Sequence, residues 1–342
     1  MAYTTIKKPS DYFNTKLYTG NGSTQSITGV GFQPDFTWIK NRSSGYSHCL
    51  YDVVRTATKR LKSNSSNAED TDTNGLTAFD LDGFSVGSSA SQNASGENIV
   101  AWNWLGANGT ASNTDGDITS TVSANTTSGF SIVKFTANGS NNGTIGHGLG
   151  STPAIVIYKR LDGTGSWYVL YTFVDGSQDY LILDSTSAKA DLASSTYGTA
   201  TSSTISNIGF GNTNSMIAYC FAEKKGFSKF GSYTGNGSTD GTFIYTGFKP
   251  AWVITKRTDS PSDWVILDNK RNSFNVVDKK LESSNSDADT TQTACDFLSN
   301  GIKLKDTTTS YLGTNISGGT YIGIAFAENP IVGTNNTPAV AR

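Results

Sequence analysis

The chain has 342 residues, a formal net charge of −2 and charged side chains at 16% of its positions, while glycine alone accounts for 36 residues. This balance supplies neither the clustered lysine and arginine that bind nucleic acid nor the Glu-, Lys- and Leu-rich stretches typical of long surface helices. We therefore expect no nucleic-acid partner and a fold made mainly of strands and turns.

Neither the first residues nor the rest of the chain predict contact with a membrane. The opening stretch, MAYTTIKKPSDYF, lacks an apolar segment, and no run of about 18 apolar residues follows it. The three cysteines, Cys49, Cys220 and Cys295, are odd in number and far apart, which favours reduced thiols over a disulfide framework or a zinc site. We expect synthesis in a cytoplasm and no membrane insertion.

One sequence block occurs three times along the chain. It reads YTGNGSTQSITGVGFQPDFTWIKNR from Tyr18, FTANGSNNGTIGHGLGSTPAIVIYKR from Phe135 and YTGNGSTDGTFIYTGFKPAWVITKR from Tyr233. The intervals, 135 − 18 = 117 and 233 − 135 = 98 residues, have the size of domains. Solenoid repeats are shorter, about 20 to 50 residues, so each copy should be a small domain with its own core.

Three recurrent patterns inside the copies predict strands and turns. Apolar residues at every second position, followed by a lysine, predict a buried strand. They are Phe36, Trp38 and Lys40, then Ile155, Ile157 and Lys159, then Trp252, Ile254 and Lys256. Alternating large and small residues at VAWNWL (Val100), IAYCFAE (Ile217) and IGIAFAE (Ile322) predict a central strand whose small-residue face meets another layer. A leucine and an alanine seven residues apart, at Leu61, Leu181 and Leu281, enclose turn formers and predict a strand end followed by a tight turn or one short helical turn. We interpret this spacing as structural and not catalytic.

Many short strands without a long helix predict an all-β chain of three tandem antiparallel β-sandwich domains. A jelly-roll, concanavalin-like topology is preferred over an immunoglobulin-like Greek key. The predicted domains are residues 1–108 with an N-terminal arm, 109–224 and 225–330, followed by a C-terminal tail, 331–342. Between the first two copies, the first half of 106–129 is interpreted as linker, and DITSTVSA as an edge strand.

The repeated blocks, together with FAEKKGFSKFG and YIGIAFAENP, resemble repeated modules of virion structural proteins of tailed bacteriophages, especially marine and cyanobacterial phages, often described as tail-fibre proteins. The resemblance covers residues 11 to 331. It implies a component of a phage particle, and the family carries no catalytic motif.

The ionisable residues give little support to an enzyme. His48 and His147 stand at unmatched places in two copies, and adjacent His48 and Cys49 should point to opposite faces of a strand. Phage fibres sometimes cleave polysaccharide with two acids, and the candidates are Glu97, Glu223 and Glu328. The last two recur at one repeat position, which favours a structural role, so no catalytic residue and no cofactor are predicted.

Two further kinds of site are considered. At the turns DLDG (Asp80) and NTDGD (Asn113), hairpin turns are the preferred interpretation and calcium loops the minor alternative, so no metal ligand is assigned. Sugar recognition would use exposed aromatics. Trp38, Trp102, Trp104 and Trp252 occupy core positions of the repeat. The candidate carbohydrate- or receptor-binding residues are therefore Trp167 and Trp264, with Asp162 and Asp263, and the favoured alternative for the two tryptophans is a role in packing.

The sequence leads to one preferred function and two alternatives. The preferred one is a non-enzymatic phage virion protein, a tail fibre or adhesin-like appendage that contacts the host cell surface. The alternatives are a capsid decoration, head-fibre or connector protein without a receptor role, and a polysaccharide depolymerase. The expected partners are other virion proteins, a host surface polysaccharide or receptor, and further copies of the chain, with a trimer as the expected oligomer.

Overall fold

The computed structural model describes residues 3–140, 143–192, 198–208, 213–309 and 313–332. Within these ranges helix is limited to the 3₁₀ turn η1 (Pro9–Asp11) and to α1 (Ala90–Asn93). All other regular elements are strands, and every strand ladder is antiparallel. The predictions of an all-β chain and of antiparallel sheets are confirmed.

Residues 1–108, called the first span below, contain two sheets. The larger sheet consists, in spatial order, of β1 (Phe13–Thr19), β9 (Asn98–Trp104), β3 (Phe36–Asn41), β4 (Cys49–Asp52), β5 (Lys59–Lys62) and β6 (Asp70–Thr71). The smaller sheet consists of β2 (Gln25–Thr28), β8 (Gly83–Val86) and β7 (Leu76–Asp80). The buried alternating strand predicted in this copy is β3, and the large–small strand is β9, its central neighbour.

Residues 109–224, the second span, have a longer main sheet. Its order is β10 (Ala111–Asn113), β11 (Ser120–Asn125), β12 (Phe130–Thr136), β19 (Ser215–Phe221), β14 (Ile155–Arg160), β15 (Tyr168–Tyr171), β16 (Asp179–Ile182) and β17 (Ala190–Asp191). A two-stranded sheet pairs β13 (Thr144–Gly146) with β18 (Thr204–Ser206). The strand predicted in DITSTVSA is β11, but β10, which was expected to be linker, pairs with its outer side. The edge strand is therefore β10 and not β11.

Residues 225–330, the third span, form one continuous sheet. Its order is β20 (Ser228–Thr234), β27 (Thr320–Pro330), β22 (Phe248–Arg257), β23 (Trp264–Asp268), β24 (Val277–Glu282), β25 (Thr290–Leu298), β26 (Gly301–Leu304) and β21 (Phe243–Tyr245). Strands β20 and β21 are thus the two ends of this sheet, although they follow one another in the chain.

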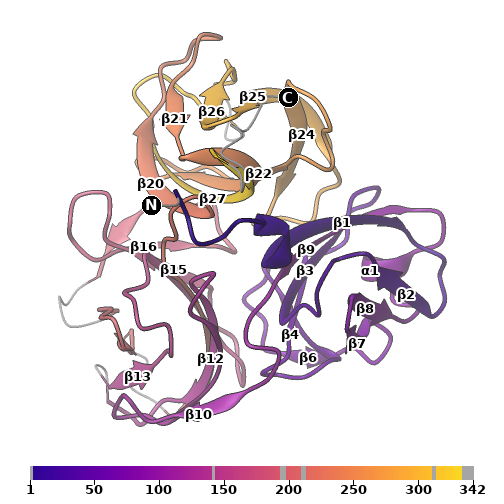
Figure 1. Ribbon diagram of the computed structural model, residues 1–342, viewed down its shortest axis with the longest axis vertical. Helices are drawn as coiled ribbons and strands as arrows, with labels where there is room; N and C mark the ends of the chain where they lie inside the picture. Colours follow the sequence, from indigo (N-terminus) through magenta and orange to yellow (C-terminus); the bar gives the residue numbers. More distant parts are fainter. Residues whose placement is uncertain (1–2, 141–142, 193–197, 209–212, 310–312, 333–342) are drawn as a thin grey trace.

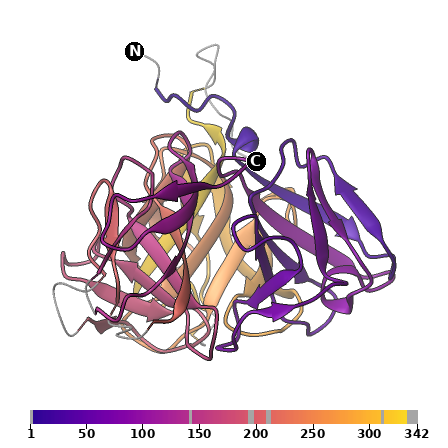
Figure 2. The ribbon, with the colours of Figure 1, turned by 90° about the horizontal axis from the view of Figure 1, so that it is seen from below.

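The three spans share one order of strands and surround a common centre. The series β1-β9-β3-β4-β5, β12-β19-β14-β15-β16 and β20-β27-β22-β23-β24 are equivalent, and each described ladder joins strands of the same span. Figure 1 shows the three groups of strands arranged as lobes about that centre, with the third span at the top. In Figure 2 the N-terminal arm and the C-terminal end of β27 leave the molecule on the same side.

The largest apolar core lies at this centre and belongs to all three spans. It contains aromatic residues from each of them: Phe13, Phe36, Trp38, Trp102 and Trp104, then Phe130, Trp167, Tyr171, Tyr219 and Phe221, then Phe227, Phe230, Trp252, Trp264 and Phe326. The four tryptophans predicted to be core, Trp38, Trp102, Trp104 and Trp252, are all at most 4% exposed. The expectation that every copy buries its large residues in a core of its own is therefore wrong for this face of the sheets.

The opposite, small-residue face of each main sheet covers a local core. Ala101, Ala218 and Ala325 lie in three separate apolar clusters, one within each span. Each cluster is closed by strands of the same span, including β8, β18 and β26. These clusters confirm the prediction that the small residues meet a second layer. A short side chain on this face leaves room for that layer to approach the sheet.

Asn-Gly turns open each repeated block as the sequence indicates. Gly22, Gly139 and Gly237 have φ values of 70°, 83° and 68°, which is the left-handed region that glycine adopts without strain. In each turn the preceding asparagine side chain accepts a hydrogen bond from a backbone N–H two residues later. The strands that follow these turns are β2, β13 and β21 in the three spans. Of the predicted C-terminal tail, residues 333–342 lie outside the described residues.

Candidate functional site

The lysine one residue before the end of each repeated strand reaches into a neighbouring span. Every one of the three side chains is buried, and its ammonium group donates to a backbone carbonyl beyond a span boundary. The three contacts are Lys40 Nζ to Ser286 O at 3.1 Å, Lys159 Nζ to Ser66 O at 2.8 Å and Lys256 Nζ to Thr186 O at 3.2 Å. The first span thus contacts the third, the second contacts the first and the third contacts the second, which closes a ring.

The ring also contains equivalent backbone contacts. Glu69 N donates to Leu161 O, Lys189 N to Thr258 O and Asp289 N to Arg42 O, at 3.0, 2.8 and 3.0 Å. Each donor follows the tight turn that was predicted after Leu61, Leu181 or Leu281. The prediction that this leucine–alanine block is structural is supported, since its turn supplies the contact surface between spans.

Burial lowers the pKa of Lys40, Lys159 and Lys256 from 10.5 to about 8. Between pH 8 and 10.5 the unfolded chain therefore binds more protons at these positions than the folded chain does. Stability contributed by these groups rises with pH through that window and is constant below and above it.

The first prediction concerns this pH dependence. We expect the free energy of unfolding of the wild type, minus that of Lys159→Met, to increase between pH 8 and 10.5 by about 1.4 kcal/mol per unit of pKa difference. Urea unfolding of both proteins across this pH range measures the difference between their free energies of unfolding. Buried tyrosines and cysteines titrate in the opposite sense, but both proteins contain them, so their contribution cancels in the difference. Lys134→Met, on a half-buried strand position, serves as control. Parallel curves for wild type and Lys159→Met would contradict the prediction.

The contact between two neighbouring spans is called a junction below. The predicted sugar-binding tryptophans lie at such junctions and are not exposed. Trp167 is 0% and Trp264 is 1% exposed, and both belong to the central core. The indole N–H of Trp167 donates to Lys62 O and that of Trp264 to Ile182 O, both at 2.9 Å and both into the preceding span. The expectation of an exposed stacking surface at these residues is therefore wrong, because the ring of spans encloses them.

The two aspartates predicted with these tryptophans have different surroundings. Asp162 is exposed at the surface and pairs with Arg160 at 2.7 Å. Asp263 is only 5% exposed and accepts a hydrogen bond from Ser284 Oγ at 2.6 Å. The structure does not bring the four candidate residues together in one surface site.

Two of the three junctions bury an aspartate–arginine pair under an aromatic donor. Asp52 accepts from Arg55 Nε at 2.6 Å and, from the second span, from the Tyr219 hydroxyl at 2.7 Å. In the third span, Asp268 accepts from Arg271 Nε at 2.6 Å and from Trp102 Nε1 of the first span at 3.1 Å. The third junction has Tyr171 in the equivalent place, and its hydroxyl has no hydrogen-bond partner among the described residues.

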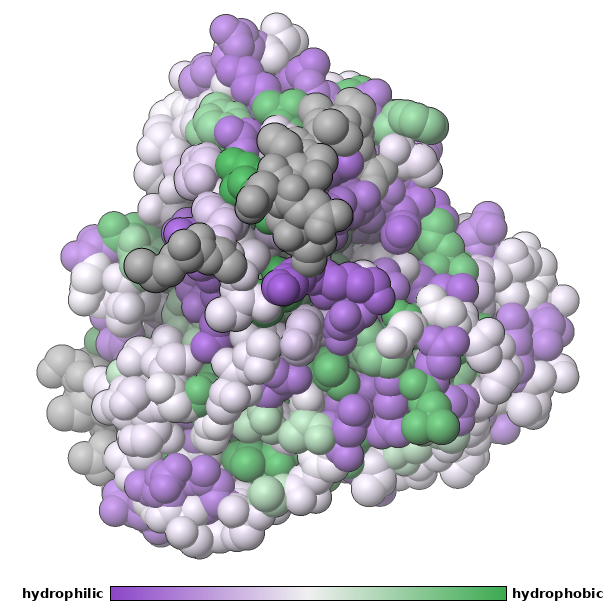
Figure 3. Space-filling view, viewed as in Figure 1, coloured by the Kyte–Doolittle hydropathy of each residue, from purple (hydrophilic) through white to green (hydrophobic). Residues whose placement is uncertain are grey.

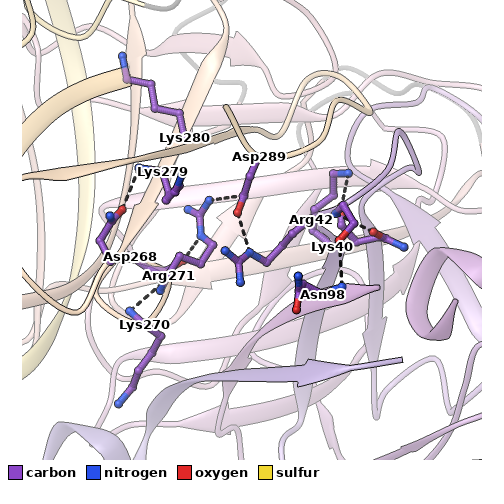
Figure 4. Close-up of polar contacts among 12 residues, drawn as sticks. Lys40, Arg42, Asn98, Asp268, Lys270, Arg271, Lys279, Lys280 and Asp289 are labelled. Atoms are coloured by element: carbon purple, nitrogen blue, oxygen red, sulfur yellow. Dashed lines mark hydrogen bonds and ion pairs between the residues drawn. The ribbon is translucent and has the colours of Figure 1, made fainter. Parts of the chain in front are cut away.

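The junction between the first and third spans carries an additional ion-pair network. Asp289 lies between two arginines and accepts from Arg42 Nε at 2.7 Å and from Arg271 Nη1 at 2.9 Å, as Figure 4 shows. Arg271 in turn holds Asp268, so that charges from both spans alternate along the network. Alternation of this kind compensates each buried charge.

The remaining candidates for chemistry are held in separate structural roles. Glu97 accepts from Asn41 and Ser44, Glu223 pairs with Lys229 at 2.8 Å, and Glu328 lies 3.6 Å from Lys249. These acids belong to three different spans or strand ends and do not face one cleft.

Histidines and acidic turns are likewise occupied. His48 immediately precedes β4, and its Nδ1 accepts a hydrogen bond from Trp38 Nε1 on the side of the central core. Burial and the nearby Lys40 hold the pKa of His48 well below its ordinary value. Cys49 lies in the local core, so the prediction of opposite faces is confirmed. Asp82 of the DLDG turn accepts the backbone N–H groups of Gly29 and Gly31. Among the described residues no group of three or more metal-binding side chains is found.

A cleft of about 450 Å³ opens in the third span, between its two end strands β20 and β21. Its lining is mainly apolar and includes Val253, Leu267 and Ile302. None of the described residues that line it is an aspartate or a glutamate, and the one cationic lining residue, Lys229, is paired with Glu223. The cleft therefore suits a neutral, largely apolar ligand group.

Hydroxyl groups in the cleft are already engaged with the protein. The Tyr233 hydroxyl lies 2.8 Å from Thr255 Oγ1 and donates to Thr314 O at 2.9 Å, while Thr255 Oγ1 donates to Ile322 O. Burial raises the pKa of Tyr233 well above its usual value. Two large side chains of β21, Phe243 and Tyr245, line the opening and are 44% and 55% exposed.

A pair of glycines explains why the third span has this cleft. Gly231 on β20 is paired with Gly323 on β27, and a Cβ at Gly231 would meet no atom within 4 Å. The equivalent cross-strand pairs are Lys16 with Ala101 in the first span and Val133 with Ala218 in the second. Sequence reasoning missed the cleft, although comparison of the three copies at this position would have shown that only the third lacks a side chain.

Comparison with known proteins places this repeated, ring-forming β chain in one family. The chain belongs to the family described as "Domain of unknown function (DUF7483)", whose model matches residues 8–330. No curated protein and no solved structure matches the chain. The match extends over all three spans, so the family model covers the whole ring.

Two further observations concern the surface. Within the described residues, no helix has the length and apolar character needed to cross a membrane. On the face shown in Figure 3, apolar side chains form small patches that are separated by polar ones.

Proposed function

We propose that this protein is a non-enzymatic structural component of a bacteriophage virion, and that it serves as a tail fibre or adhesin-like appendage that contacts the host cell surface. Its sequence blocks resemble modules of such proteins. The observation that carries the proposal is the use of the repeated residues: the recurrent lysines and tryptophans donate hydrogen bonds between spans instead of facing a common reactive site. A ring held in this way is a rigid platform.

For the finer fold, we propose that each span is one β-sandwich domain of jelly-roll type, with boundaries at 1–108, 109–224 and 225–330. The support is the shared strand order and the separate local core between the main sheet and the strands that cover it. The large faces of the three sandwiches would then pack on one another at the centre.

We further propose that the chain is made in the host cytoplasm and assembles into the virion with other virion proteins as a homo-oligomer, with a trimer as the working model. Strands β1 and β20 each end a sheet, and sheet ends favour partners. Light scattering on the purified protein measures its mass, and a monomer at micromolar concentration would contradict the oligomer but not the appendage role.

The second prediction tests the appendage role. Fluorescently labelled protein is expected to bind cells that the encoding phage infects, and an excess of unlabelled protein is expected to slow adsorption of that phage. Heat-unfolded protein is the control. Gold-labelled antibodies viewed on intact particles distinguish a tail position from a capsid position. Label restricted to the capsid, together with no cell binding, would replace the appendage with capsid decoration.

The same preparation tests the depolymerase alternative. Release of reducing sugars from host polysaccharide, abolished by Glu223→Gln, would contradict the non-enzymatic proposal. We expect no release, because Glu223 is held by Lys229 and by the Phe230 backbone N–H, and the described residues that line the cleft include neither Glu223 nor any other acid.

A further inference from the structure

The second and third spans differ at the outer edge of one equivalent strand. In the second span, β12 pairs with β19 on one side and with β11 on the other. In the third span, β20 pairs with β27 on one side and ends the sheet on the other. The sheet of the second span thus extends two strands further, through β11 and then β10, and β11 lies at the place where the third span has its cleft.

The register of β11 shows what the extra strand contributes. Val122 of β11 lies opposite Val133 of β12, is 6% exposed and belongs to the local core of the second span. The residue of β20 that corresponds to Val133 is Gly231. The third span therefore lacks two side chains at this place, one because of the glycine and one because no strand lies outside it. Their absence accounts for the cleft.

The backbone of β20 presents an unpaired edge beside the cleft. Ala327 N donates to Phe227 O, and Gly235 N donates to Gly319 O, so the odd-numbered residues of β20 face β27. The N–H and C=O of the even-numbered Ser232 then point outward, where β20 has no strand partner among the described residues. Ser232 is exposed to solvent.

The neighbouring edge groups already have partners, which limits where a ligand can add. The Phe230 N–H donates to the Glu223 carboxylate at 3.2 Å, and the Thr234 carbonyl accepts from Thr242 Oγ1 at 2.6 Å. The open part of the edge is therefore short and centred on Ser232, directly beside Gly231 and the cleft.

We propose that the β20 edge accepts an extended segment of another polypeptide as an antiparallel strand, with a large apolar side chain of that segment inserted over Gly231 and Gly323. Main-chain hydrogen bonds to Ser232 supply affinity and the cleft supplies specificity, as in β-strand addition generally. The segment is uncharged at the inserted position, since none of the described residues that line the cleft carries a carboxylate and Lys229 is paired.

The β20 edge and the cleft indicate which kind of peptide segment can bind. Only the identity of the protein that carries this segment rests on the proposed function. Within this chain, β11 is an example of a strand that such an edge accepts: it is uncharged and carries apolar Val122 between Thr121 and Ser123. If the protein is a virion component, the segment belongs to another virion protein, and strand addition attaches the ring to the particle.

The third prediction tests strand addition with a peptide probe of residues 118–125, Ile-Thr-Ser-Thr-Val-Ser-Ala-Asn, labelled with fluorescein at its N-terminus. We expect fluorescence anisotropy to show saturable binding to the full chain. Ser232→Pro removes the outward N–H without touching a bond to β27, and it is expected to weaken binding by about tenfold or more. Ser232→Ala keeps the backbone donor and should bind as the wild type does.

The cleft is tested with a second peptide in which valine, at the position of Val122, is replaced by phenylalanine. The wild type is expected to prefer the phenylalanine peptide, because Gly231 leaves room for the larger ring. Gly231→Val fills that space as Val133 does in the second span, and it is expected to reverse the preference. Equal affinity of the two peptides in both proteins would overturn insertion into the cleft.

Amide exchange on the unmodified protein provides a readout that does not depend on a variant folding. Saturating phenylalanine peptide should protect the Ser232 amide and leave that of Leu17, on the equivalent strand β1, unchanged. No binding of either peptide at millimolar concentration, or no protection at Ser232, would overturn the proposal. Peptide binding by a protein that is absent from virions would overturn the virion role alone, and cell binding without peptide binding would overturn strand addition alone.

Discussion

Replacing Trp104 by alanine is expected to lower the free energy of unfolding by about 3–5 kcal/mol, the usual cost of deleting a large buried aromatic side chain. Trp104 is 2% exposed, and its ring centroid lies 4.8 Å from Phe13, 5.6 Å from Trp252 and 6.5 Å from Phe221. These neighbours belong to all three spans. The loss should therefore be felt by the whole ring in one transition, as measured by urea unfolding followed by circular dichroism and by hydrogen exchange.

The matched control for this fourth prediction is Phe84→Ala. Phe84 is fully buried in the local core of the first span, and every member of that cluster belongs to the first span. We expect its alanine variant to accelerate exchange mainly in residues 13–104. If Trp104→Ala also accelerated hydrogen exchange only in the first span, that result would contradict a core that couples the three spans.

Replacing Asp268 by alanine is expected to be comparably damaging, by about 3–5 kcal/mol, because it leaves the buried Arg271 guanidinium without its closest counter-charge. Arg271 and Asp268 side chains are both 0% exposed, and Trp102 Nε1 also loses its acceptor. Burial opposes ionisation of Asp268, but Arg271 brings the pKa of that carboxyl below its ordinary value. Its contribution is present at neutral pH and is lost as the pH falls through the lowered pKa.

The third junction offers the control for this fifth prediction. Tyr171→Phe removes a hydroxyl that has no hydrogen-bond partner among the described residues, so its effect on the free energy of unfolding should be near zero or stabilising. Thermal and urea unfolding of both variants, in parallel with Asp52→Ala, compare the three equivalent positions. A small loss in Asp268→Ala would show that the buried pair contributes little to holding the first and third spans together.

The ring has consequences for how the copies can differ. Two junctions use a buried aspartate–arginine pair with Tyr219 or Trp102, and the third uses Tyr171 and apolar neighbours. Unequal junctions favour one neighbour for each span, because a buried aspartate placed against an apolar partner would lose the hydrogen bond that Tyr219 or Trp102 donates to it. Each span is also free to vary on its outward face, where the third has its cleft.

Much of the local structure was predictable because it depends on short-range patterns. Alternation around Trp38, Ile157 and Ile254 predicts strands, since side chains of a strand point to opposite faces. The Asn-Gly dipeptides predict left-handed turns because glycine tolerates positive φ. The same reasoning placed His48 and Cys49 on opposite sides of one strand, and it placed a strand in DITSTVSA.

The candidate site was predicted poorly for an equally physical reason. Trp167 and Trp264 follow polar loops, which suggested exposure, but both side chains are buried and donate to the preceding span. The cleft depends on a cross-strand pair, Gly231 with Gly323, whose members are 92 residues apart (323 − 231 = 92). Neither burial against another span nor the pairing of distant glycines leaves a pattern within one stretch of sequence.

The sequence by itself determined that the chain is built of strands, that it is repeated three times and that each central strand has a large and a small face, because these properties follow from neighbouring residues. Only the tertiary structure decided that the three large faces share one core, that lysines and tryptophans close the spans into a ring, and that β20 is left with an open edge beside a cleft. Such features arise from contacts between distant segments, whose energies no local pattern encodes.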